Sequence, residues 1–138
     1  MHAEFISPDD PRWQRYLESN WHDFYHLPDY VKLCAYHEGG IPIAFYAQYR
    51  GASFLVPLII RPLPESLNAS PGWCDCVSPY GYSTPLVAPT QEQLPAFIEA
   101  FVALAKERNL VAAFFRLHPL SGAKKSQTEL PAASPGRI

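Results

Sequence analysis

Residues 41–64, IPIAFYAQYRGASFLVPLIIRPLP, are the stretch that decides the fold. Apolar side chains alternate at a period of two over residues 41–49, which is typical of a β-strand. Gly51 lies in the turn that follows, and the run over 54–60 is almost entirely apolar, as expected for a strand buried on both faces. The stretch therefore predicts a long hairpin within a sheet.

Pro57 falls inside the second strand of this hairpin. Proline has no backbone N–H, so it removes one donor from the ladder of a sheet. We expect Pro57 to mark a bulge or an unpaired position, and a break there to splay two neighbouring strands.

Shorter segments surround the hairpin. Thr90 and Gln93 match a helix-capping box, although Pro95 favours a later start for that helix. The expected elements are a strand at 4–6, a helix from Pro11, a helix from Pro28 to Gly39, a strand at 73–78, a helix over 90–109 and a strand over 110–120. This order predicts one α+β domain over residues 1–120, with a mostly antiparallel central sheet flanked by helices. Residues 121–138 lack periodicity and large apolar side chains, and we expect a disordered tail there.

Composition bears on which partners the protein binds and on where in the cell it is found. The net charge is −2 and no basic run is present, so the sequence does not predict nucleic-acid binding. No apolar run approaches the roughly 18–20 residues of a membrane span. The first residues lack the features of a signal peptide, and we expect a soluble, cytoplasmic protein.

The three cysteines are too few for a disulfide scaffold. Cys74 and Cys76 share one face of a predicted strand, but no second pair exists to complete a zinc site, so we expect core cysteines and no metal. Cys34 lies near His26 and His37 in sequence. It is either a nucleophile paired with histidine or a buried thiol on the apolar side of a helix.

The strongest site candidate is the loop SPYGYSTP, residues 78–85. Gly81 permits a positive φ and a close approach of ligand to backbone. Tyr80 and Tyr82 offer rings for stacking and hydroxyls for hydrogen bonds. The alternative is that both tyrosines fill the gap between sheet and helix.

A second candidate is the strand end that carries Arg116 and His118. An arginine there either binds a carboxylate or phosphate, or extends from the sheet edge into solvent. Asp75, also at a strand end, is a possible partner for Arg116.

Two segments resemble a known family. D-x-x-S-P-Y-G-Y-x-x-P-L, from Asp75 to Leu86, and F-x-R-L-H-P, ending at Pro119, follow one another as in the first half of Fem-like transferases. These belong to the GNAT acyltransferase superfamily and include the peptidoglycan aminoacyltransferases. The resemblance implies two GNAT-like halves, with donor and acceptor meeting in clefts of the assembled pair. It also implies that the Y-G-Y loop lines the acceptor cleft, with Arg116 and His118 near it.

On this basis we expect the acceptor-binding half of an enzyme that transfers an acyl or aminoacyl group to a small amine or peptide-like acceptor. Catalytic roles fall to Tyr80 and Arg116, and the substrate-binding residues are Ser78, Tyr80, Gly81, Tyr82, Asp75 and His118. The family's coenzyme A loop is not found, so the donor, an acyl-coenzyme A or an aminoacyl donor, is expected to be bound by the whole enzyme. A second GNAT-like half or a homodimer would complete it. The alternative is a non-catalytic module that binds a small ligand or pairs its sheet edge with another chain.

Overall fold

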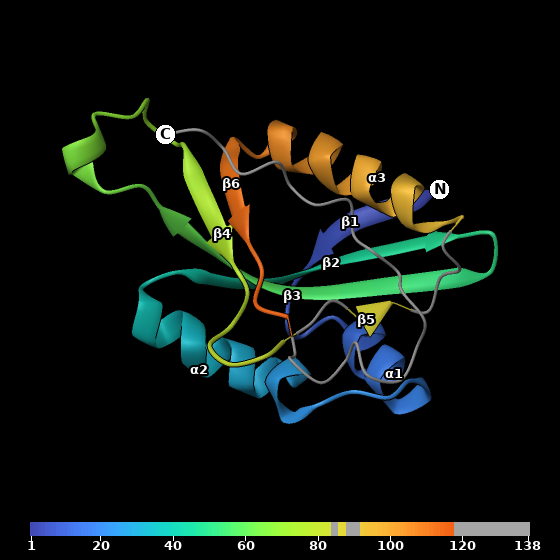
Figure 1. The fold of residues 1–138 in the computed structure, drawn as a ribbon. Helices are drawn as coiled ribbons and strands as arrows, with labels where there is room; N and C mark the ends of the chain where they lie inside the picture. Colours follow the sequence, from blue (N-terminus) through green and yellow to red (C-terminus); the bar gives the residue numbers. More distant parts are fainter. Residues whose placement is uncertain (84–85, 88–91, 118–138) are drawn as a thin grey trace.

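The computed structural model describes residues 1–83, 86–87 and 92–117 of the chain (Figure 1). Along the chain its elements are β1 (His2–Ile6), α1 (Pro11–Ser19), the 3-10 turn η1 (Phe24–His26), α2 (Pro28–Glu38), β2 (Ile41–Tyr49), β3 (Ala52–Pro62), the 3-10 turn η2 (Glu65–Leu67), β4 (Cys74–Val77), β5 (Leu86–Val87), α3 (Leu94–Glu107) and β6 (Leu110–Phe114). The predicted α+β class is confirmed. The tail predicted over 121–138 lies outside the described residues.

One mixed sheet organises the molecule. Its order is β1-β2-β3-β4-β6, and β5 pairs with β3 beside this path. Every pair is antiparallel except β4 with β6, which is parallel. The predicted hairpin is confirmed, because β2 and β3 pair continuously from Ile41↔Ile60 to Tyr49↔Ala52.

The unpaired position expected at Pro57 is present on one edge of β3, whereas the pairing with β2 continues without a break through Ala44↔Pro57. On that edge, Phe54 and Leu55 pair with β5, and residues 59–62 pair with β4. The three residues between them, with Pro57 at their centre, pair with neither strand. On the opposite side, eight residues (78–85) separate β4 from β5. Eight residues against three make an excess of five, and the described part of the candidate loop, residues 78–83, therefore leaves the path of the strand. A proline suits this position because a donor is not needed there.

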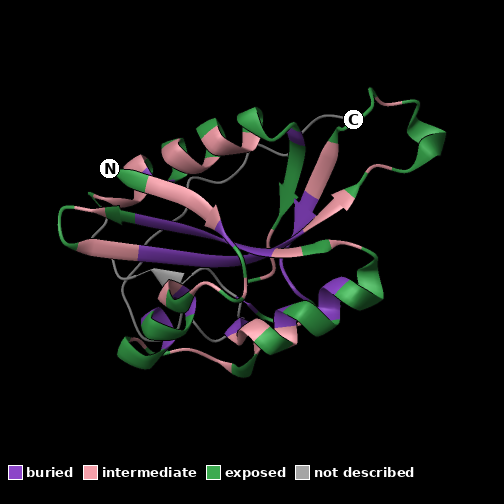
Figure 2. Ribbon diagram, turned by 180° about the vertical axis from the view of Figure 1, so that it is seen from behind, coloured by how far each residue is buried: buried purple, intermediate pink, exposed green. Residues whose placement is uncertain are grey.

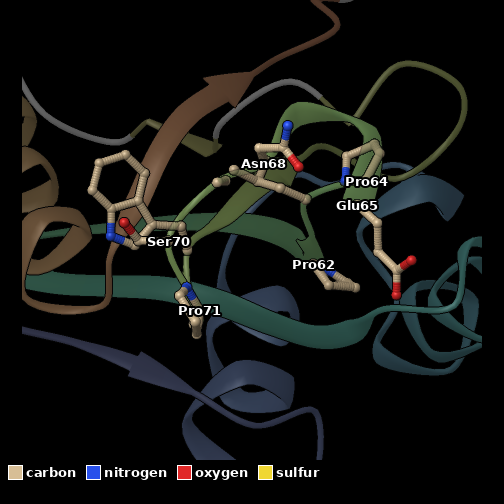
Figure 3. A pocket seen from close by; sticks show the side chains of 10 residues that line it. Pro62, Pro64, Glu65, Asn68, Ser70 and Pro71 are labelled. Carbon is tan, nitrogen blue, oxygen red and sulfur yellow. The ribbon is translucent and has the colours of Figure 1, made fainter.

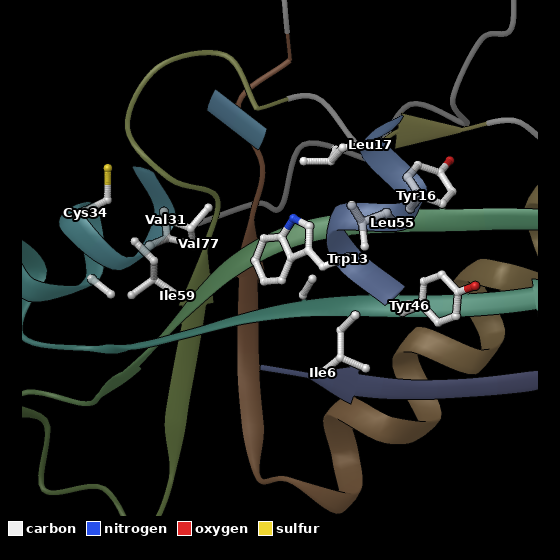
Figure 4. Packing of buried hydrophobic residues seen from close by; sticks show 12 residues of the cluster. Ile6, Trp13, Tyr16, Leu17, Val31, Cys34, Tyr46, Leu55, Ile59 and Val77 are labelled. Atoms are coloured by element: carbon white, nitrogen blue, oxygen red, sulfur yellow. The ribbon is translucent and has the colours of Figure 1, made fainter. Parts of the chain in front are cut away.

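Helices cover both faces of the sheet (Figure 1). Against one face, α1 and α2 bury a core around Trp13 and Leu55, shown in Figure 4. Against the other, α3 packs Phe97 on Phe54 with ring centroids 5.2 Å apart. Figure 2 shows the buried residues concentrated in β2 and β3, whereas β6 is mostly exposed. The interior of the domain therefore lies about the central hairpin, and β6 is a partly covered edge.

Helix boundaries follow the local signals with one exception. Asp10 caps α1 by accepting from the backbone N–H of Arg12, and Pro11 takes the first helical position, as predicted. The capping box at the start of α3 is wrong: Gln93 stands at the N-cap position rather than three residues after it, and Thr90 lies outside the described residues. Pro95 in the first turn is consistent with this later start.

Candidate functional site

The ends of two parallel strands position the candidate loop. β4 ends at Val77 and β6 ends at Phe114, and these two residues are paired in register. One residue further, the N–H of Ser78 donates to the carbonyl of Phe114 at 2.8 Å. The carboxyl ends of parallel strands are a common place for a ligand site, because the chain leaves the sheet there.

Two serines hold the loop from within. Ser78 is 1% exposed, and its hydroxyl accepts from the backbone N–H of Arg116 at 2.9 Å. Ser83 is fully buried and donates to the carbonyl of Pro79 at 3.3 Å. Ser78, predicted to bind substrate, is thus placed inside the fold, where it joins the loop to the segment after β6.

Aromatic side chains from η1 and α2 pack against the loop. The hydroxyl of Tyr30 donates to the carbonyl of Tyr80 at 2.8 Å, and burial raises the pKa of Tyr30. Gly81 has a φ of 98°, and a Cβ there would lie 2.3 Å from a ring carbon of Tyr25. The close approach predicted at Gly81 is therefore present, but it is made by the ring of Tyr25.

The tyrosines of the loop point outward. Tyr80 is 72% exposed and Tyr82 is 46% exposed, so the interpretation that both fill a gap between sheet and helix is wrong. Tyr82 meets the ring of Tyr25 edge to face, with centroids 6.2 Å apart. Phe24, also largely exposed, lies 4.6 Å from the ring of Tyr30. We call the set Phe24, Tyr25, Tyr30, Tyr80, Tyr82 and Phe114 the aromatic surface.

Arg116 lies at the border of the aromatic surface. Its guanidinium carbon is 5.9 Å from the ring centroid of Tyr80 and 5.3 Å from that of Phe114. Such cation–π contacts orient the guanidinium plane as well as stabilise it. The side chain is half-buried, and its Nη1 donates to the carbonyl of Ser78 at 3.4 Å.

Asp75 was considered as the partner of Arg116, but it pairs with Arg61. Its two carboxylate oxygens accept from Nε and Nη2 of Arg61 at 2.9 and 2.7 Å. Arg61 and Asp75 are directly paired in the β3–β4 register, and Arg61 also contacts Glu38 at 3.1 Å. These carboxylates raise the pKa of Arg61. The pairing of Asp75 with Arg116 is therefore wrong.

Nothing among the described residues supplies an activated nucleophile or a metal site. Cys76 is 1% exposed and burial raises the pKa of its thiol to about 11, in keeping with a core cysteine. Cys34 is buried against Tyr30, and Nδ1 of His26 accepts from the backbone N–H of Asp23 at 2.9 Å. No group of three metal-ligating side chains occurs in this part of the chain, and His118 lies just beyond it.

A hollow of about 310 Å³ lies elsewhere, on the β3–β4 connection (Figure 3). Its whole lining comes from residues 62–73 of that one connection, including Trp73 and the carboxylate-bearing Glu65. Separate elements do not converge on it, so we place the candidate site at the aromatic surface.

Sequence reasoning found the loop but missed the residues beneath it. Phe24, Tyr25 and Tyr30 lie in the run HDFYHLPDY, around the start of the helix predicted from Pro28, where the sequence predicts no site residue. The density of aromatic residues around Pro28 was the available signal. Comparisons with protein-family models, with curated proteins and with solved structures gave no match. No helix among the described residues is long and apolar enough to cross a membrane.

Proposed function

We propose that this chain is the acceptor-binding half of a Fem-like acyl- or aminoacyltransferase of the GNAT superfamily. The observation that carries the proposal is the loop at the carboxyl ends of β4 and β6, which exposes Tyr80 and Tyr82 beside Arg116. A mostly antiparallel sheet flanked by helices is the layout that the resemblance implies.

Transfer of an acyl group to an amine needs alignment of two reactants and removal of one proton. Tyr80 and Arg116 are the residues proposed to contact the reactants. Tyr82 and the backbone at Gly81 would form the surface on which the acceptor lies, with Ser78 holding the loop. His118 completes the proposed set, and Asp75, which pairs with Arg61, lies two residues before the end of β4. The donor, an acyl-coenzyme A or an aminoacyl donor, would bind once a second half or a second copy is present.

Thermal-shift measurements test the acceptor role directly. The purified chain is titrated with small amines, with short peptides and with acetyl-coenzyme A. We expect amines or peptides to raise the melting temperature, and Tyr80→Ala to abolish that shift. Tyr36→Ala is the matched control, because Tyr36 is an 88% exposed tyrosine on α2 outside the aromatic surface. A shift with acetyl-coenzyme A alone would contradict the assignment to the acceptor half.

Tyr80→Phe separates binding from chemistry. The ring is kept and only the hydroxyl is lost, so acceptor binding should persist. Transfer to the bound amine, followed by mass spectrometry in the assembled enzyme, should fall sharply. Unchanged transfer would remove Tyr80 from the catalytic set.

A second candidate function, a protein-interaction module, is favoured by the exposure of β6. This strand pairs with β4 on one edge, and no described residue pairs with the other. It carries no charge, and Val111 and Phe114 are 50% and 58% exposed. Natural edge strands are usually protected by charges or prolines, so an uncharged one suits pairing with a second copy of the chain. Sedimentation should then show a dimer that Ala113→Lys dissociates, whereas Ile98→Lys on α3 has no effect; a monomer at high concentration would exclude this candidate.

A further inference from the structure

The arginines of the described residues differ in how their charge is balanced. Three of them are half-buried: Arg12, Arg61 and Arg116. Arg12 contacts the carboxylates of Glu4 and Asp10. Arg61 likewise contacts two carboxylates, whereas Arg116 forms no ion pair with any described residue. Removal of a guanidinium from water without a counter-charge is unfavourable, so an unpaired half-buried arginine indicates an anion that is supplied from outside.

The geometry of Arg116 is already fixed for such an anion. Its backbone N–H is held by the hydroxyl of Ser78, and its guanidinium lies over the rings of Tyr80 and Phe114. Among its five N–H donors, one is used by the carbonyl of Ser78, in a long bond of 3.4 Å. The remaining donors have no partner among the described residues. A planar fork held in one orientation loses little entropy when it binds two oxygens at once.

We infer that Arg116 binds a carboxylate of the ligand, so that the acceptor is an amino acid or short peptide that carries a free carboxylate. This rests on the proposed function. A carboxylate has one charge and two oxygens, which match one guanidinium and two of its parallel N–H groups. A phosphate dianion would carry a second charge, and no other cation contacts the aromatic surface among the described residues. The exposed rings of Tyr80 and Tyr82 provide apolar surface for a flat group beside the carboxylate.

Binding of glycyl-tyrosine, of its C-terminal amide and of phenyl phosphate tests the inference. The dipeptide and its amide differ only in the carboxylate, and isothermal titration calorimetry gives each Kd. We expect the free acid to bind roughly tenfold or more tightly than the amide, as for a hydrogen-bonded charged pair. Nε–Hε of Arg116 should shift in NMR spectra when the acid is added.

Variants test whether Arg116 causes the preference for the free acid over the amide. Arg116→Gln should reduce the ratio of the two Kd values to about one, and Arg116→Lys should keep part of it because the charge remains without the fork. Arg50→Gln is the matched control, since Arg50 also lies over a tyrosine ring, at 5.0 Å from Tyr49, and is far along the hairpin. Melting temperatures confirm that each variant is folded.

The outcomes separate this inference from the proposed function. Equal binding of acid and amide, lost in Tyr80→Ala, overturns the carboxylate assignment and keeps the acceptor surface. Tighter, Arg116-dependent binding of phenyl phosphate also overturns it and assigns the fork to phosphate. Failure of all three probes and of the amine and peptide screen overturns both proposals.

Discussion

Substitution of Gly81 tests the packing that presents the two tyrosines. Gly81→Ala adds one methyl group at a residue whose φ is 98°. That methyl would lie 2.3 and 2.5 Å from two ring carbons of Tyr25, well inside normal contact. The ring of Tyr25 is itself held edge to face by Tyr30 and Tyr82, with centroids 5.7 and 6.2 Å away. Either the ring or the loop must move.

The cost has two parts that a control can separate. A side chain in left-handed backbone costs roughly 1–2 kcal/mol. Forcing an extra methyl into packed groups costs a further ~1–3 kcal/mol. Gly72→Ala is matched for the first part, because Gly72 has a φ of 83° and nothing within 4 Å of its added Cβ. The difference between the two variants should therefore be about 1–3 kcal/mol, with Gly81→Ala the less stable.

Urea unfolding followed by tryptophan fluorescence gives these free energies of unfolding. In a Tyr25→Ala background the ring is absent, and Gly81→Ala should then cost about as much as Gly72→Ala. Equal costs for Gly81→Ala and Gly72→Ala in the natural chain would refute the close packing of loop on ring. So would a Gly81→Ala cost that Tyr25→Ala leaves unchanged.

Three further predictions concern the core and the first helix. Hydrogen bonds from Arg12 lower the pKa of Asp10 from 3.8 to about 2, so the stability that this carboxylate provides is complete above about pH 4 and is lost as the pH falls toward 2; acid titration of Asp10→Asn should lack that step. Trp13→Phe leaves a buried carbonyl without its indole N–H donor and should cost about 1–3 kcal/mol in urea unfolding. Iodoacetamide should label the half-buried Cys74 before Cys76, whose thiol is buried and has a pKa raised to about 11, and tandem mass spectrometry of the peptide would show the order.

Much of the fold was predictable because its signals are local. The period-two pattern of β2 and the apolar run of β3 define the hairpin without any distant information. Pro57 predicted an unpaired position in β3, since a missing donor is a property of one residue. The predicted start of α3 was wrong. Thr90 and Gln93 have the spacing of a capping box, but the N-cap is Gln93, and Pro95 in the first turn is consistent with that later start.

The candidate site was predictable only as a loop, because its contacts join distant segments. Tyr25 meets Gly81 across more than fifty positions of sequence, and no local pattern states which ring lies under which glycine. The partner of Asp75 depends on the β3–β4 register, which sets Arg61 opposite it. Ser78 was predicted to bind substrate, yet its hydroxyl, like that of the buried Ser83, bonds to the backbone of the fold itself. Composition of a loop shows what it can bind but not which side chains it keeps for its own structure.

The edge strand β6 adjoins the aromatic surface. Phe114 ends that strand and lies beside Arg116, which follows two residues later. A strand paired to the outer edge of β6 would lie about 4.8 Å from it. Its side chains would then contact Phe114 and Arg116 and border the aromatic surface on that side. Self-association would then strengthen ligand binding, and by reciprocity ligand would strengthen self-association. Sedimentation with and without glycyl-tyrosine distinguishes the two cases. A shift toward dimer on adding the dipeptide means that the site is completed by a second chain, whereas unchanged association means that Arg116 and the tyrosines act within one.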